Sequence, residues 1–182
     1  MIRSVFSMHE AVFLDRDGVI NEVLSKRVKF VNTPDDFHLL EGVGAAIRKL
    51  NGAGYKVFVV TNQGGVGLGF MSERDLHEVH GKMEDDLEVY GARVDDIAYC
   101  PDRPGTHSRC RKPAPGMILD LAEKHDIDLA RSFMAGDREP DIQAGKNAGT
   151  RTAFIGRDEK RRTGADFHFP DLLSFSQWLT NV

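Results

Sequence analysis

The feature that most constrains the fold is the regular alternation of short apolar runs with segments of helical period. Residues 11–14 and 56–61 are apolar and rich in β-branched side chains, which is typical of buried strands. Similar runs predict strands at 97–100, 132–135 and 150–155. Strands that alternate with helices pair in parallel through right-handed crossovers. The sequence therefore predicts an α/β fold, a three-layer sandwich with a central parallel sheet.

The helices between these runs are marked by apolar residues three and four positions apart. The clearest one has Ser72 as a plausible N-cap and Asp75 three residues later. It carries an apolar stripe that consists of Leu76, Val79, Met83, Leu87 and Tyr90. Further helices are expected near 43–50, 118–125, 141–148 and 171–179.

Length and composition fit one compact domain over residues 1–182. Hydrophobic residues make up 41% of the 182 residues, which is enough for a buried core. The net charge of −4 argues against a nucleic acid as the main partner, because such proteins usually carry a basic surplus. A small phosphorylated substrate is compatible with this charge, since a site needs only local positive charge.

Two further features bear on the compartment. Cys100 and Cys110 are too few for a disulfide framework, so a reducing compartment is the default expectation. Residues 1–10 have no apolar core of signal-peptide length, and no apolar run is long enough to span a bilayer. We therefore expect a soluble, cytoplasmic protein without a membrane partner, and a monomer.

Polar side chains follow four of the predicted strands, where ligands bind in open parallel sheets. They are Asp15 and Asp17, Thr61 and Asn62, Arg111 and Lys112, and Asp137 and Asp141. Each group also has an ordinary structural interpretation. The first could be an Asx-turn and the second the start of a flexible glycine-rich loop. The third could be a solvated lysine and the fourth a pair of acidic helix caps. Their order and placement together favour a functional site.

Four segments carry a resemblance to a known family. They are FLDRDGVIN (13–21), VVTNQGGVGLG (59–69), CRKPAPGM (110–117) and AGDREPDIQAG (135–145). With them the sequence resembles the haloacid dehalogenase (HAD) superfamily of phosphatases. Within it, the sequence is most similar to the small, capless group of histidinol-phosphate and heptose-bisphosphate phosphatases.

The resemblance implies a role for each catalytic residue. Asp15 would be the nucleophile that forms an aspartyl phosphate. Asp17 would be the general acid and then the general base, which requires a raised pKa. Thr61 and the Asn62 backbone would bind the transferring phosphoryl group, and Lys112 would neutralise charge between Asp15 and the phosphate.

The resemblance also implies a metal and a substrate site. Mg²⁺ would be held by Asp15, the backbone carbonyl of Asp17 and Asp137, with Asp141 orienting its water shell. The residues expected to bind substrate are Asn62, Gln63, Arg111 and Arg138. Two further arginines, Arg103 and Arg109, are weaker candidates for a second anionic group of the substrate.

No cap domain is expected, because residues 18–60 and 63–111 are used up by the predicted loops and helices. The pocket should then be open. Its walls would be the loops 25–36, 64–70 and 101–111.

A structural zinc site is doubtful. In the resembled group a Cys-x-His and a later Cys-x-Cys hold zinc, whereas this chain has Asp102 in place of the histidine and Ser108 in place of a cysteine. Cys100, Asp102, His107 and Cys110 remain as candidate ligands, but their spacing is not a strong zinc signature. We expect no zinc.

The expected function is a Mg²⁺-dependent phosphomonoester hydrolase. By analogy its leading substrate is D-glycero-D-manno-heptose 1,7-bisphosphate, with histidinol phosphate or another small sugar phosphate as the alternative. A phosphotransferase, a receiver-like signalling domain and a non-catalytic sugar-phosphate binding domain are the rival interpretations. A receiver lacks a second acid two residues after the nucleophile, which here is Asp17.

Overall fold

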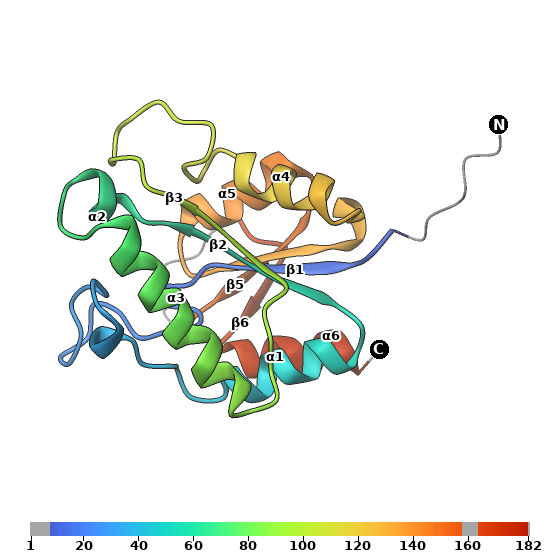
Figure 1. Cartoon of the computed structure of the whole chain (residues 1–182). Coiled ribbons are helices and arrows are strands. Elements are labelled where there is room, and N and C mark those ends of the chain that lie inside the picture. Colours follow the sequence, from blue (N-terminus) through green and yellow to red (C-terminus); the bar gives the residue numbers. More distant parts are fainter. Residues whose placement is uncertain (1–7, 158–163, 182) are drawn as a thin grey trace.

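A computed structural model describes residues 8–157 and 164–181 of the chain (Figure 1). All described strands belong to one six-stranded parallel sheet in the order β3-β2-β1-β4-β5-β6. The strands are β1 (Ala11–Leu14), β2 (Lys56–Asn62), β3 (Asp96–Cys100), β4 (Phe133–Gly136), β5 (Arg151–Ile155) and β6 (Phe167–Phe169). The expected five strands are found within a residue of their predicted ends. The edge strand β6 was not predicted, because a three-residue segment is too short for a period-2 pattern.

Helices cover both faces of the sheet, which confirms the three-layer sandwich (Figure 1). One face carries α1 (Val43–Gly52), α3 (Glu73–Glu88) and α6 (Leu172–Thr180), and the other carries α4 (Gly116–Lys124) and α5 (Glu139–Ala148). The short elements are α2 (Gly64–Gly67) and the 3₁₀ turns η1 (Pro34–Asp36) and η2 (Leu129–Arg131). The glycine-rich segment, expected as an irregular loop, thus begins with one helical turn.

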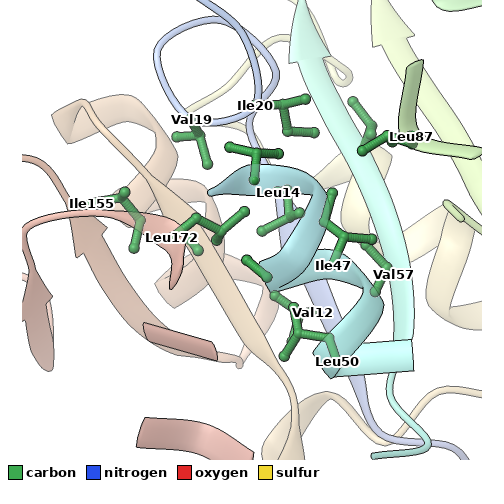
Figure 2. Close-up of a cluster of buried hydrophobic side chains, with 14 of the residues drawn as sticks. Val12, Leu14, Val19, Ile20, Ile47, Leu50, Val57, Leu87, Ile155 and Leu172 are labelled. Atoms are coloured by element: carbon green, nitrogen blue, oxygen red, sulfur yellow. The ribbon is translucent and has the colours of Figure 1, made fainter. Parts of the chain in front are cut away.

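The central strand β1 is apolar at every position because it is buried on both faces. Val12 and Leu14 lie in the core beneath α1 and α6, where Leu172 is also buried (Figure 2). Ala11 and Phe13 point to the opposite face and pack in the core beneath α4 and α5. Successive side chains of a strand alternate between faces, so only a fully apolar segment suits this position.

The start of α3 is as predicted, but its end is not. The Ser72 hydroxyl accepts a hydrogen bond from the Asp75 N–H, and the Asp75 carboxylate accepts one from the Ser72 N–H, which forms a capping box. The buried stripe runs from Leu76 to Leu87. Tyr90, which the sequence placed on the same stripe, lies beyond the last helical residue and is half exposed.

The topology brings the carboxyl ends of all six strands to one edge of the sheet, on the side where α2 lies (Figure 1). That edge holds the polar residues singled out in the sequence.

Across residues 8–157 and 164–181, no helix is long and apolar enough to cross a membrane.

Candidate active site

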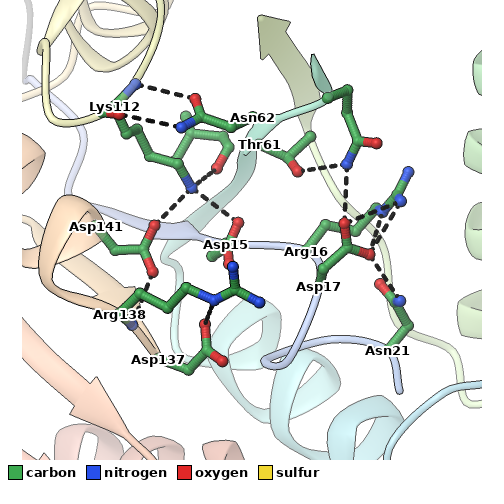
Figure 3. Close-up of polar contacts among 12 residues, drawn as sticks. Asp15, Arg16, Asp17, Asn21, Thr61, Asn62, Lys112, Asp137, Arg138 and Asp141 are labelled. Carbon is green, nitrogen blue, oxygen red and sulfur yellow. Dashed lines mark hydrogen bonds and ion pairs between the residues drawn. The ribbon is translucent and has the colours of Figure 1, made fainter. Parts of the chain in front are cut away.

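Asp15 and Lys112 meet at the centre of this edge. Asp15 directly follows β1, and its backbone N–H still pairs with the Ala135 carbonyl at 3.0 Å, so its position is fixed by the sheet. The Lys112 ammonium lies 2.8 Å from Asp15 Oδ1 and 2.8 Å from Asp141 Oδ1, and donates to the Val60 carbonyl at 2.7 Å (Figure 3). Three acceptors match the three protons of an ammonium group. Lys112 is therefore a buried site residue, with 4% of its surface exposed, and not a solvated surface lysine.

The Asn62 side chain fixes the loop that carries Lys112. Its Oδ1 accepts from the Lys112 backbone N–H at 2.9 Å, and its Nδ2 donates to the Lys112 carbonyl at 3.1 Å (Figure 3). This pair of hydrogen bonds ties the loop after β3 to the end of β2. The side chain of Asn62 is thus occupied within the protein.

Three carboxylates lie together beside this one ammonium, and two of them contact it. Asp15, Asp137 and Asp141 each present an oxygen, and these oxygens lie within 4.8 Å of one another. Burial, and after it the charge of Asp141, raises the pKa of Asp15 to about 8 and that of Asp137 to about 6. Burial alone would lower the pKa of Lys112, but its attraction to Asp141 and Asp15 prevails and raises it. The cluster contains three carboxyl groups and one ammonium group. A second cation would therefore stabilise the ionised carboxylates.

The donor set fits Mg²⁺, which takes oxygen ligands. Asp137 Oδ1 is buried and has no hydrogen-bond partner among the described residues, while the Arg138 Nε is 3.9 Å away. Gly18 has a φ of +90°, and a Cβ at this position would lie 2.3 Å from Asp137 Oδ2. A glycine is therefore required for Asp137 to approach the turn after Asp15. The carboxylate of Asp17 is not part of this cluster, so its expected contribution remains the backbone carbonyl.

Asp17 lies in a different environment from the one expected. Arg16 donates to Asp17 Oδ1 from Nη2 at 3.0 Å and from Nε at 3.2 Å, and Asn21 donates to the same oxygen at 2.9 Å (Figure 3). Gln63 donates to Oδ2 at 3.0 Å. Burial by itself would raise the pKa of Asp17, but the charge of Arg16 and these hydrogen bonds outweigh it and lower the pKa. The expectation of a raised pKa for Asp17 is therefore wrong in this structure.

Sequence reasoning missed the residues that surround Asp17. Arg16 and Asn21 are fully buried, although both lie in the segment that carried the resemblance. His80, on α3, is also buried, and its Nε2 has no hydrogen-bond partner in the described part of the chain. Burial and then the charge of Arg16 lower the pKa of His80 to about 3. Only adjacency to Asp17 in sequence pointed to Arg16, and nothing in the sequence pointed to His80.

A pocket of about 720 Å³ opens above these groups. As expected, its walls come from three loops. They contribute Val23, Leu24, Phe30, Val31 and Asn32, then Gly64, Gly65, Leu68, Phe70 and Met71, and finally Pro104, Gly105 and Arg111. Asp15, Asp17, Asn62, Gln63, Lys112, Arg138 and Asp141 also line the pocket.

Of the four arginines considered as anion ligands, two line the pocket and two are paired elsewhere. Arg111 and Arg138 line the pocket, although an Nη1 of Arg111 also donates to the Asp102 carbonyl at 3.0 Å. Arg109 is paired with Asp120 through two hydrogen bonds on the surface, and Arg103 donates to the Gly67 carbonyl at 2.6 Å. Only Arg111 and Arg138 are therefore positioned to contact a bound anion.

The cysteine loop differs from the expectation of two free thiols. Cys100 and Cys110 are joined by a disulfide bond. Asp102 lies beside the pair, and oxygen and sulfur atoms of these three residues are within 4.8 Å of one another. His107, the fourth zinc candidate, is not part of this group. Since zinc binds thiolates, the disulfide form does not offer the sulfur ligands of a zinc site.

A parallel sheet with an aspartate after β1, a threonine near the end of β2, a lysine before α4 and paired acids after β4 defines a HAD-type phosphatase. A family model described as HAD-hydrolase-like matches residues 109–172. The chain belongs to the HAD superfamily of phosphatases. Its relatives place it more narrowly, in the heptose-bisphosphate phosphatase family.

Two of these relatives and one solved structure illustrate the similarity. D-glycero-β-D-manno-heptose-1,7-bisphosphate 7-phosphatase of Rhodopseudomonas palustris is 46% identical over 146 residues, which is 76% of this chain and 79% of that protein. D-glycero-α-D-manno-heptose-1,7-bisphosphate 7-phosphatase of Burkholderia mallei is 38% identical over 81% of this chain and 79% of its own. The crystal structure of the D,D-heptose 1,7-bisphosphate phosphatase of B. bronchiseptica, complexed with magnesium and phosphate, has a TM-score of 0.87 and 34% identity, covering 94% of this chain and 98% of that one.

Proposed function

We propose that this chain removes the 7-phosphate of D-glycero-D-manno-heptose 1,7-bisphosphate through an aspartyl phosphate on Asp15. The observation that carries the proposal is the buried contact of 2.8 Å between Asp15 and Lys112, beside the Asp137–Asp141 pair. The relatives named for this reaction support the choice of substrate.

In the first step, Asp15 attacks the phosphorus atom and the bond from phosphorus to the sugar oxygen breaks. The electron pair stays on the sugar oxygen, which takes a proton from Asp17. Lys112 and the Thr61 hydroxyl stabilise the charge on the phosphoryl oxygens. The substrate brings negative charge next to Asp17, and this offsets the effect of Arg16 that favours the ionised carboxylate.

In the second step, water attacks the phosphorus atom and Asp17 takes its proton. The bond from phosphorus to Asp15 breaks, which restores the Asp15 carboxylate and releases inorganic phosphate. Asp15, Asp137 and the Asp17 carbonyl would hold Mg²⁺, which supplies a Lewis acid for the phosphoryl oxygens when bound. We propose Mg²⁺ as the functional metal and no zinc.

The pocket supports a substrate with a second anionic group. Arg111 and Arg138 both line it, together with Lys112. Arginine binds phosphate with several donors in a fixed plane, so these two residues suit the distal phosphate of a bisphosphate. A volume of about 720 Å³ suits a small molecule.

We also propose that residues 1–182 form one domain that works as a monomer on a small molecule. The single described sheet supports one domain, and the net charge of −4 favours a small molecule over a nucleic acid as the partner. Light scattering should give the mass of one chain, 20.3 kDa.

The decisive test is turnover of both anomers of the heptose bisphosphate and of histidinol phosphate, with and without Mg²⁺. We expect Mg²⁺-dependent release of one phosphate per heptose bisphosphate and at least about tenfold lower kcat/KM for histidinol phosphate. Asp15→Asn should abolish turnover while the circular dichroism spectrum is unchanged. Near-normal activity of that variant would exclude the mechanism, and equal rates on all substrates would exclude the substrate assignment.

A further inference from the structure

Gln63 connects two parts of the proposed machinery that the sequence did not link. It directly follows β2 and is 6% exposed. Its Nε2 lies 3.0 Å from Asp17 Oδ2 and 2.8 Å from Thr61 Oγ1. An amide nitrogen has two protons, so both are used inside the protein. Donation to a substrate would require Gln63 to break one of these hydrogen bonds.

The two oxygens of Asp17 are held differently. Oδ1 receives hydrogen bonds from Arg16 and Asn21 at 2.9–3.2 Å. Oδ2 receives one from Arg16 at 3.2 Å and the shorter one from Gln63 at 3.0 Å. Gln63 therefore holds Oδ2 on the side of Thr61, where the phosphoryl group is proposed to bind.

The same contact sets the direction of the Thr61 hydroxyl. Its oxygen accepts from Gln63, and the hydrogen bonds among the described residues give its own proton no acceptor. The side chain is fully buried. The hydroxyl is thus left as a donor, which is what a phosphoryl oxygen requires.

We propose that Gln63 is a positioning residue and not a donor to the substrate: it aims Asp17 Oδ2 and leaves Thr61 as a donor to the phosphoryl group. The inference rests on the proposed function, since Asp17 must act as acid and base. It gives Gln63 an indirect role in place of the expected direct contact with the substrate. It also separates the roles of neighbouring residues, because the Asn62 side chain fixes Lys112 and the Gln63 side chain fixes Asp17.

The test compares esters with different leaving groups in Gln63→Met, which removes both donors and keeps an unbranched side chain. A sugar phosphate needs a proton on its departing oxygen, whereas 4-nitrophenolate departs without one. We expect kcat on the heptose bisphosphate to fall about 10- to 100-fold, with KM changed less than about twofold, since a positioned acid contributes about 10²–10⁴-fold.

The aryl ester 4-nitrophenyl phosphate separates formation of the aspartyl phosphate from its hydrolysis. With 4-nitrophenyl phosphate, the variant should release a rapid burst of one 4-nitrophenolate per active site, followed by slow turnover, because water activation in the second step still needs Asp17. The burst also counts correctly folded enzyme. Gln63→Glu, which cannot donate from either oxygen when ionised, should show the same pattern, and the exposed Gln177→Met on α6 should behave as wild type.

Two results would overturn the proposal while leaving the proposed function intact. One is an unchanged kcat in Gln63→Met. The other is a raised KM with equal losses on both esters, which would make Gln63 a substrate ligand. An inactive wild-type protein with no aspartyl phosphate on Asp15 would instead refute the proposed function itself.

Discussion

At the scale of single residues, the site is defined by an imbalance of buried charge. Lys112 contacts two carboxylates, and Asp137 adds a third within 4.8 Å. Burial, and after it the charge of Asp141, raises the pKa of Asp15 to about 8 and that of Asp137 to about 6. The residues proposed to hold the metal are therefore also residues that bind protons readily.

This imbalance predicts that Mg²⁺ binding releases protons. A carboxyl group with a pKa of about 8 is mostly protonated at pH 7, and the metal requires its ionised form. Binding should therefore release close to one proton per Mg²⁺ at pH 7 and nearly none at pH 9. Affinity should weaken as the pH falls from 8, by up to about tenfold per pH unit for one proton.

Titration calorimetry in two buffers with different ionisation heats measures this release. The apparent binding heat should differ between the buffers at pH 7 and agree at pH 9, which serves as the internal control. Equal heats in both buffers at pH 7 would contradict the prediction.

At the scale of elements, the loop from β3 to α4 carries the proposed catalytic residue Lys112 at one end and the disulfide at its base. Asn62 holds the end with Lys112 against β2. At its base, Ser108 Oγ lies 3.2 Å from Cys110 Sγ and 3.5 Å from Cys100 Sγ. Ser108 therefore occupies the position at which the resembled group has a zinc-binding cysteine.

The composition of this loop predicts that the protein contains no zinc. Asp102 and Ser108 replace two of the four expected ligands, and the remaining sulfurs are joined in the disulfide. Elemental analysis of protein purified without chelator should find far less than one zinc per chain. Thiol titration should find two thiols only after reduction.

A double variant that should gain a zinc site serves as the positive control for this test. Asp102→His combined with Ser108→Cys restores the ligand pattern of the resembled group and should bind about one zinc per chain. One zinc per chain in the unaltered protein would show that Cys100 and Cys110 are metal ligands and would refute the prediction.

At the scale of the whole molecule, the site exists only when the sheet is complete. Asp15 follows β1, Thr61 belongs to β2, Lys112 follows the loop after β3, and Asp137 follows β4. The four strands are adjacent in the order β3-β2-β1-β4. A ligand that contacts all of them binds the folded chain and not the unfolded one, so it stabilises the whole domain.

Mg²⁺ with orthophosphate, the reaction product, should therefore raise the melting temperature. At about 100 times the Kd, a ligand stabilises by about 2.7 kcal/mol. For a domain of this size this corresponds to a rise of about 5–10 °C. Differential scanning calorimetry measures the shift.

Two matched aspartate variants identify where the ligand acts. Asp137→Asn removes a proposed metal ligand and should lose most of the shift. Asp120 lies on α4 and pairs with Arg109 on the surface. The variant Asp120→Asn should therefore keep the rise in melting temperature. Loss of the shift in Asp120→Asn or its retention in Asp137→Asn would contradict the assignment of the site.

The sequence by itself determined five of the six described strands, most of the helices and the polar residues at the edge of the sheet. Strands and helices are local patterns, and parallel strands separated by helices must end at a common edge, so Asp15, Thr61, Lys112 and Asp137 were predictable. Only the tertiary structure decided how side chains pair across that edge. The bidentate contact of Arg16 with Asp17, and the lowered pKa that results, depend on rotamers and burial that no spacing encodes. The contact of Gln63 with Asp17, 46 positions away in sequence, was likewise fixed by packing.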